Sequence, residues 1–401
     1  MRRDCWRLGA NECKIKFEHF TGWTYPMSFL EDNAAFETWL AGQCQVVKPD
    51  LEYKHKRMRR DAFTFLRATY FRWAGCIEAA CPELAATPAI LAVGDIHLEN
   101  FGTWRDAEGR LVWGVNDFDE AAVMPYAFDL VRLAASARLA GTVKKAKQHR
   151  LTPFAALPRR DIDRAILEGY RAGLDRPHPT LLDERETWLR PYVACSDKQR
   201  RKFWEKDIDT LPTTDPDPPA KVIAGFRRVM PKRASIERLA RRPKQGSGSL
   251  GRPRFVAIAS WNGGRIAREA KALIPSAWDW AHGRHDAPSR FADLSSGPHR
   301  SPDPWLRVEN GFIFRRIAAD SRKVNLLKNP DTNAAEPDAS AVAKLLAAMG
   351  FELGAIHAAD ASRTQAIEND LDGRDPDWLH NAAEAASARV VADYEAWCAI
   401  A

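Results

Sequence analysis

The stretch "GDIHLENFG", residues 94–102, follows directly on the short apolar run "AILAV" at 89–93. It concentrates Asp95, His97 and Asn100 within six positions. The apolar run predicts a buried strand, and the end of a strand is a place where a rigid scaffold can hold reactive side chains in a fixed geometry. We therefore interpret this stretch as a candidate functional site.

A second polar group follows a second apolar run, so the pattern occurs twice. Residues 111–115 predict another strand, which a turn at 106–109 joins to the first motif, and "NDFDEA" then supplies Asp117 and Asp119. An Asp, an Asn five residues later and a further Asp are typical of phosphoryl transfer. Asp95 would accept the proton of the attacking hydroxyl, while Asn100 and Asp117 would hold magnesium. Asp119 would bind a second metal or orient Asn116; a polar hairpin with capped turns is the alternative.

The glycine-rich stretch "GSGSLG", residues 246–251, matches the G-x-G-x-x-G pattern of phosphate-binding loops. Its glycines let backbone N–H groups approach phosphate oxygens. The strand-like "RFVAIASW" follows it, which favours the loop of a kinase over that of a dinucleotide-binding helix. Lys271, twenty residues after the last glycine, is the candidate for gripping the phosphates, with Arg268 as the alternative; an exposed lysine on a basic strand is the plainer interpretation. The candidate nucleotide contacts are Gly246, Ser247, Gly248, Ser249, Gly251, Lys271 and Arg268.

These motifs resemble those of two families. The first two are similar to the catalytic motifs of the aminoglycoside and choline phosphotransferases, within the protein-kinase-like superfamily. More closely, "GDIHLENFG", "NDFDEAAVMPYAFDLVRLAAS", "LARRPKQGSGSLGRPRFV" and "LGAIHAADASR" resemble the bacterial domain of unknown function 2252 family over roughly residues 54–395. The resemblance implies a kinase-like fold that uses ATP and Mg²⁺. It also implies that Asp129 braces the catalytic loop from the next helix.

The order of the motifs is the reverse of that in ordinary kinases, because the glycine-rich loop follows the catalytic motif. We therefore expect an α+β, two-lobed, protein-kinase-like fold that is circularly permuted. The expected divisions are an N-terminal helical segment (1–88), a catalytic hairpin with large-lobe helices (89–210), a linker (211–235), a nucleotide-binding small lobe (236–330) and C-terminal helices that complete the large lobe (331–401).

The composition of the chain indicates where the protein is located and which partners it has. The chain has 401 residues, a net charge of +7 and seven cysteines without a C-x-x-C pair, and it contains no apolar run long enough to span a membrane. We expect a cytoplasmic protein whose partners are a nucleotide and an unidentified hydroxyl-bearing acceptor, with no membrane and no specific nucleic acid. The basic residues are spread along the whole chain, which favours a mildly basic enzyme.

Two other reactions fit parts of the sequence. "GDIH" resembles the D-x-H that opens a metal-dependent phosphoesterase, and a kinase-like fold can also transfer AMP. His97 would contact phosphate or Asp117, or serve as a structural hydrogen-bonding residue. Arg67 is expected beside the site, and Arg315 and Arg316 are further candidates for phosphate or substrate contacts.

Overall fold

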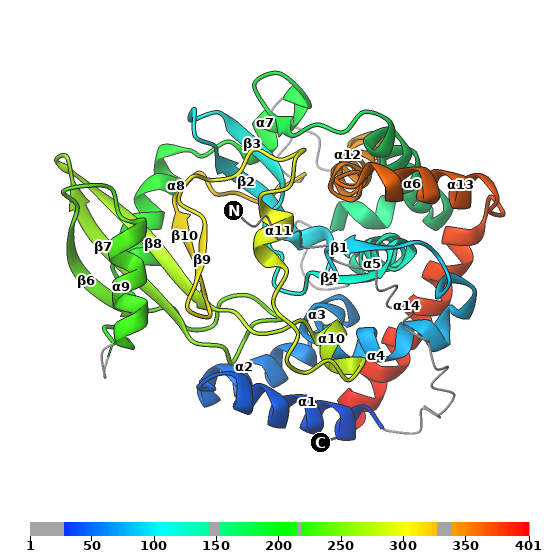
Figure 1. The fold of residues 1–401 in the computed structure, drawn as a ribbon, viewed down its shortest axis with the longest axis horizontal. Helices are drawn as coiled ribbons and strands as arrows, with labels where there is room; N and C mark the ends of the chain where they lie inside the picture. Colours follow the sequence, from blue (N-terminus) through cyan, green and yellow to red (C-terminus); the bar gives the residue numbers. More distant parts are fainter. Residues whose placement is uncertain (1–27, 144–151, 215–217, 327–338, 401) are drawn as a thin grey trace, which may run out of the picture.

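The computed structural model describes residues 28–143, 152–214, 218–326 and 339–400, and the fold is α+β as expected. Figure 1 shows a sheet and helix α9 (Ala220–Val229) at one end of the molecule and a larger helical body at the other. This sheet has five strands. The sheet and α9 come from one continuous stretch, residues 220–317, whereas the helical body combines segments from before and after it. The expected residues 1–27 of the N-terminal segment lie outside the described part of the chain.

The elements follow one another along the chain with short 3₁₀ or π turns between some of them. The helices are α1 (Phe29–Gln43), α2 (Lys48–Met58), α3 (Ala62–Ala68), α4 (Tyr70–Ala80), α5 (Tyr126–Gly141), α6 (Arg159–Asp175), α7 (Arg190–Val193), α8 (Asp197–Lys202), α9 (Ala220–Val229), α10 (Ala277–Ala281), α11 (Phe291–Ser295), α12 (Ala339–His357), α13 (Ala361–Asp372) and α14 (Trp378–Ala399). The strands are β1 (Ala89–Ala92), β2 (Phe101–Arg105), β3 (Leu111–Val115), β4 (Ala122–Pro125), β5 (Thr180–Leu181), β6 (Ser235–Arg241), β7 (Arg254–Trp261), β8 (Gly264–Ala272), β9 (Arg307–Glu309) and β10 (Phe312–Ile317).

The helical body is held together by the crossing of α6 and α12, which approach each other closely. A side chain at Gly169 or Gly173 of α6 would collide with the backbone of α12, and one at Gly350 or Gly354 of α12 would collide with the backbone of α6. Glycine at four-residue spacing on both helices thus allows the two backbones to touch. The long helix α5 is buried along nearly its whole length between these helices and α14.

The two strands expected to form one hairpin belong to different sheets, which corrects the sequence interpretation. β1 pairs antiparallel with β4, whereas β3 pairs with β2, a strand that the sequence analysis did not identify. The turn at Asp106–Gly109 is present, but it joins β2 to β3. The two polar motifs still lie side by side. The backbone N–H of Asn116, at the start of the second motif, donates a hydrogen bond to the backbone carbonyl of Asn100, in the first, at 3.0 Å.

The five-stranded sheet is antiparallel with the order β6-β7-β8-β10-β9. Alternate residues of β7 face opposite sides. Phe255 and Ala257 pack with Phe226 of α9, whereas Val256 packs on the other side with Phe203, which begins the π-helical turn η5 (Phe203–Ile208). Both faces are therefore covered, and Glu269 and Lys271 of β8 lie on the face that α9 does not cover.

Several expected elements occur where the sequence placed them. β7 coincides with "RFVAIASW", and α5, α6, α12 and α14 correspond to the amphipathic or alanine-rich segments. The expected linker at 211–235 is wrong in its second half, because residues 220–229 form α9. Its buried Val222, Phe226 and Val229 recur at helical spacing on one face. The expected loop at 285–306 contains the short helix α11.

One helix in the described residues, α12, is long and apolar enough to cross a membrane by composition. Two thirds of its apolar window (67%) is buried inside the protein, as in the core helix of a soluble protein. No disulfide joins the cysteines within the described residues, which are Cys44, Cys76, Cys81, Cys195 and Cys398.

Candidate active site

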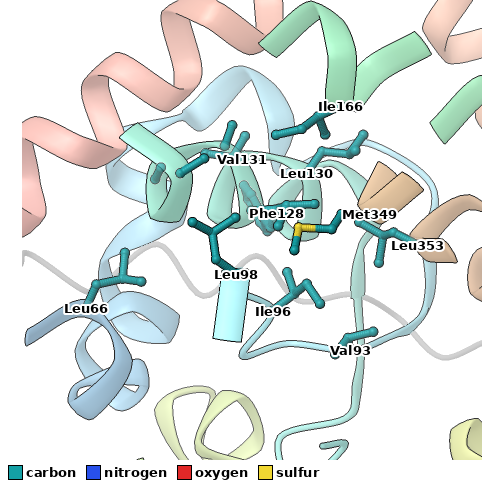
Figure 2. Packing of buried hydrophobic residues seen from close by; sticks show 14 of the residues in the cluster. Leu66, Val93, Ile96, Leu98, Phe128, Leu130, Val131, Ile166, Met349 and Leu353 are labelled. Atoms are coloured by element: carbon teal, nitrogen blue, oxygen red, sulfur yellow. The ribbon is translucent and has the colours of Figure 1, made fainter. Parts of the chain in front are cut away.

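In the segment after β1, apolar side chains that point into the core alternate with polar side chains that point into a cleft. Val93, Ile96 and Leu98 are buried, and Figure 2 shows their side chains among those of α5 and α12. The intervening Asp95 and His97 instead line a cleft of about 540 Å³ between the helical body and the five-stranded sheet. Burial of the apolar residues therefore sets the direction of the polar ones.

Asp95 is paired with a buried arginine. Arg132 of α5 is fully buried, and its Nε lies 3.0 Å from Oδ1 of Asp95, which its Nη2 also contacts. Burial raises the pKa of Asp95 to about 7, and Arg132 only partly opposes this shift. The sequence analysis did not identify Arg132, although its position three residues after Asp129 places the two on the same side of a helix.

Asp129 holds the backbone that precedes Asp95, in agreement with the bracing role that the resemblance implied. Its carboxylate accepts hydrogen bonds from the N–H groups of Val93 at 2.7 Å and Gly94 at 2.9 Å. It also lies 3.1 Å from Nε2 of His357, in α12. Asp129 is completely buried, so these contacts replace its hydration.

His97 and Asn100 both make local hydrogen bonds. His97 Nδ1 accepts from the N–H of Glu99 at 3.1 Å and caps the turn η2 (Leu98–Asn100), while burial and the nearby Arg67 lower its pKa well below the usual value. His97 is thus a neutral capping residue that lines the cleft. Asn100 donates its amide N–H to the carbonyl of Asp95 at 2.6 Å, which leaves its Oδ1 as the acceptor.

Asp117 and Asp119 meet Lys271 across the two parts of the molecule. Lys271 Nζ lies 3.1 Å from Asp117 Oδ1 and 2.6 Å from Asp119 Oδ2, and Arg252 also contacts Asp119 at 3.1 Å. Burial together with the charge of Asp117 raises the pKa of Asp119 to about 6. Burial would also raise the pKa of Asp117, but Lys271, Asp119 and Arg315 together outweigh it and keep this pKa below its usual value.

The carboxylates beside Lys271 fit a magnesium ion. Oδ1 of Asp119 is buried and has no hydrogen-bond partner, and the side chain of Asp117 is 37% exposed to the cleft. Within the described residues no three His, Cys, Asp or Glu side chains gather as a metal site. Magnesium, however, is commonly held by one or two carboxylates together with substrate phosphates and water. The donor set of Asp117, Asp119 and Asn100 suits it.

The glycine-rich loop joins β6 to β7 and lies against Asp95. A Cβ at Gly248 would come within 3.3 Å of Asp95 Oδ2, and Ser247 Oγ is buried without a hydrogen-bond partner. The helix α2 holds both ends of the loop: Arg57 donates to the carbonyl of Gly246 at 3.0 Å, and the Gly251 carbonyl accepts from the N–H of Val47, the residue before α2, at 2.8 Å.

The remaining expected residues divide between the cleft and the opposite side of the sheet. Arg67 lines the cleft and pairs with Glu99 at 2.7 Å. Arg268 does not belong to the site, because it lies on the α9 side of β8, where it donates to the carbonyl of Val229 at 3.2 Å. Arg315 and Arg316 both line the cleft.

The cleft also contains charged residues that the sequence analysis did not single out. Ten Lys and Arg residues line it against seven Asp and Glu residues, so its lining is cationic. Those not identified from the sequence include Lys202, Arg242, Arg252, Arg254, Arg300, Arg322 and Lys323. An excess of cations in a cleft favours anionic ligands.

Comparison with known proteins gives one match. Residues 47–179 match the family model described as "Uncharacterized protein conserved in bacteria (DUF2252)". No curated protein and no solved structure matches the chain. The matched residues include Asp95, Asn100, Asp117 and Asp129, and they end before the five-stranded sheet begins. Over this part, which contains the segment that carries Asp95, the chain is similar to the DUF2252 family.

Proposed function

We propose that this protein is an ATP- and Mg²⁺-dependent phosphotransferase with a circularly permuted, protein-kinase-like fold, acting on a hydroxyl-bearing acceptor in the cytoplasm. One observation carries the proposal. The glycine-rich loop, far from the polar motifs in sequence, lines the same cleft as they do, with Gly248 against Asp95. Lys271 does not line the cleft: it is buried, and its ammonium group lies between Asp117 and Asp119, which do line it.

The arrangement of the small lobe supports a kinase-like assignment. In protein kinases the glycine-rich loop covers the phosphates and the phosphate-binding lysine lies on the third strand. Here the loop joins the first two strands of the sheet and Lys271 lies on the third, β8. The helical body supplies the acid and amide groups of the other lobe, with the two lobes in the reverse order along the chain.

Each of these side chains has a separate role in the proposed phosphoryl transfer. Asp95 accepts the proton of the acceptor hydroxyl, and its pKa of about 7 suits a base that works near neutral pH. Asn100, Asp117 and Asp119 hold magnesium, which would neutralise the charge of the phosphates. The backbone of residues 246–251 and Lys271 hold the donor phosphates, and Asp129 keeps the segment before Asp95 in position.

The phosphoesterase alternative receives less support. A two-metal hydrolase needs several metal-binding histidines and carboxylates around its metals. Nδ1 of His97 accepts a backbone hydrogen bond, and His357 lies behind the site between Asp129 and Tyr170. AMP transfer would use the same cleft with the nucleotide reversed, and product analysis distinguishes it.

The decisive experiment combines binding with product analysis. Calorimetry of the full chain with ATP should show binding that strengthens with Mg²⁺, and in Asp117→Asn this dependence on Mg²⁺ should be lost while the fold survives. Incubation with MgATP and a cell extract, followed by mass spectrometry, should give an acceptor heavier by one phosphoryl group. An adenylylated product would replace phosphoryl transfer by AMP transfer, and the absence of ATP binding in a folded sample would refute the proposal.

A further inference from the structure

Three arginines from different strands surround one buried carboxylate beside the cleft. Glu269 of β8 contacts Arg254 of β7 and Arg315 of β10, each at 2.8 Å from its Oε1, and Arg242, which follows β6, at 2.5 Å from its Oε2. We call Arg242, Arg254 and Arg315 the arginine cluster. The pairing of the strands sets its geometry, because Arg315 lies directly opposite Glu269 in the register of β10 and β8.

The arginine cluster carries more charge than Glu269 requires. Glu269 is fully buried, and although burial would raise its pKa, the arginines hold the pKa well below its usual value. Glu269 is therefore ionised and contributes one negative charge against three positive ones. A single arginine would neutralise it, and each guanidinium has five N–H donors in a planar fork. Asp117 and Asp119 offset part of this surplus at Arg315, and the remaining charge and N–H donors are available to an anion.

The arginine cluster adjoins the glycine-rich loop and faces the cleft. All three arginines line the cleft. Arg254 Nη2 donates to Oγ of Ser249 in the loop at 2.9 Å, and the neighbouring Ser247 Oγ is buried without a hydrogen-bond partner. This unsatisfied hydroxyl is independent of the arginines, and it marks the same end of the cleft as a place for hydrogen-bonding ligand atoms.

Lys271 alone is poorly suited to hold a phosphate chain. Its ammonium group contacts both Asp117 and Asp119, at 3.1 Å and 2.6 Å, so its charge is shared with two carboxylates. It lies two residues beyond Glu269 on the same face of β8, next to the arginine cluster. A donor with linked phosphates in the cleft would therefore meet the arginine cluster, whereas Lys271 is buried and does not line the cleft.

We propose that the arginine cluster is the binding site for the oligophosphate chain of the donor, with Glu269 as the positioning residue that fixes the three guanidinium groups. This inference rests on the proposed function for the identity of the donor as a nucleoside triphosphate. Guanidinium groups bind phosphate through paired hydrogen bonds, and such charge-assisted bonds are the strong ones. The site should favour ligands with two or more linked phosphates over monophosphates and nucleosides, because a longer phosphate chain brings more negative charge and more acceptor oxygens to the three guanidinium groups.

The test measures binding of inorganic tripolyphosphate, ATP and AMP to the full chain by calorimetry. Arg315→Gln and Arg242→Gln each remove one guanidinium and leave two beside Glu269. Loss of a hydrogen bond to a charged group costs about 1.5–3 kcal/mol, so each variant should bind tripolyphosphate and ATP roughly 10–100-fold more weakly. AMP affinity should change far less. The matched control is Arg265→Gln, which removes an exposed arginine of β8 that pairs with Asp209 and does not line the cleft.

The outcomes separate this inference from the proposed function. If the wild type binds ATP and both variants bind it with unchanged affinity, the arginine cluster is not the phosphate site, and the proposed function stands. A second outcome is that the binding of tripolyphosphate weakens in the variants, while the wild type binds ATP no more tightly than tripolyphosphate. The inference then stands, but the assignment of a nucleotide as the donor fails. A wild-type protein that is folded and binds neither probe overturns the inference. Melting temperatures near that of Arg265→Gln verify that the variants are folded.

Discussion

The carboxylate of Asp129 lies 3.1 Å from Nε2 of His357, and both side chains are completely inaccessible to solvent. The contact joins α5 to α12 across the interior of the helical body. Tyr170 of α6 extends it, because its hydroxyl lies 2.8 Å from Nδ1 of the same histidine. Since Asp129 also accepts the N–H groups of Val93 and Gly94, three helices converge on the backbone that carries Asp95.

Asp129→Asn tests this bracing. An amide presents one acceptor oxygen where the carboxylate presents two, so at least one buried N–H loses its partner. An unsatisfied buried group costs about 1–3 kcal/mol, and we expect a melting temperature lower by several degrees. The control is Asp161→Asn in α6, a carboxylate that is 40% exposed and pairs with Arg164, and this change should alter stability by less than about 0.5 kcal/mol. Equal melting temperatures for the two variants would contradict the bracing role.

Asp95→Asn tests the assignment of the general base. A positioned base contributes roughly 10²–10⁴-fold to the rate, so single-turnover transfer should slow by about that factor while ATP affinity stays close to the wild-type value. Arg132 remains buried and loses its ionic partner, so we also expect a lower melting temperature. Loss of ATP binding in a folded Asp95→Asn sample would make Asp95 a metal or nucleotide ligand instead. Truncation of Lys271 should weaken ATP binding as well as the rate.

The pH dependence of transfer follows from the pKa of about 7 at Asp95. Only the ionised carboxylate accepts a proton, so kcat/KM should rise with pH through about pH 7 and level off above it. The measurement is a pH–rate profile at saturating Mg²⁺, with ATP affinity followed over the same range. A profile that is flat between pH 5.5 and 8.5 would exclude Asp95 as the base.

Lys54 provides a prediction for stability that is independent of the reaction. It is 1% exposed in α2, lies over the rings of Phe36 and Phe71, and burial lowers its pKa to about 8. Its pKa in the unfolded chain is about 10.4, so the unfolded state binds more protons between these values, and stability should rise as pH increases from about 8 to 10.4. Lys54→Met should remove this rise and raise the melting temperature at pH 7.

The control for Lys54 is Lys56→Met, an exposed lysine on the same helix. Because its ammonium group is hydrated in both states, its replacement should leave the pH dependence of the melting temperature as in the wild type. A rise of stability with pH that persists in Lys54→Met would show that other groups cause it.

Those residues of the candidate site that belong to short, contiguous sequence patterns could be predicted from the sequence. The spacing from Asp95 to Asn100 and Asp117 can be read within one short segment of the chain, and the glycine-rich loop is a contiguous pattern, so both were found. The pairing of β1 with β4 was missed because both strands are short and apolar, and their partners are set by the helices that cover them. Arg315 was named from the sequence, but Arg132, Arg242 and Arg254 were missed because their roles arise from contacts between elements distant in sequence. Arg268 and Lys271 lie on opposite sides of β8, because side chains three residues apart in a strand point to opposite faces of the sheet. Which of the two faces the candidate site becomes clear only once the register of the strand is known.

The split origin of the helical body has a consequence for synthesis of the protein. α6 leaves the ribosome well before α12, and the whole five-stranded sheet is made between them. At about 5–20 residues per second, the face of α6 around Gly169 and Gly173 stays uncovered for on the order of ten seconds. The sheet with α9 is contiguous and can form within that interval. The nascent chain thus exposes an apolar helix surface during the period when chaperones act, and α12 covers this surface only after every residue that lines the candidate active site has been made.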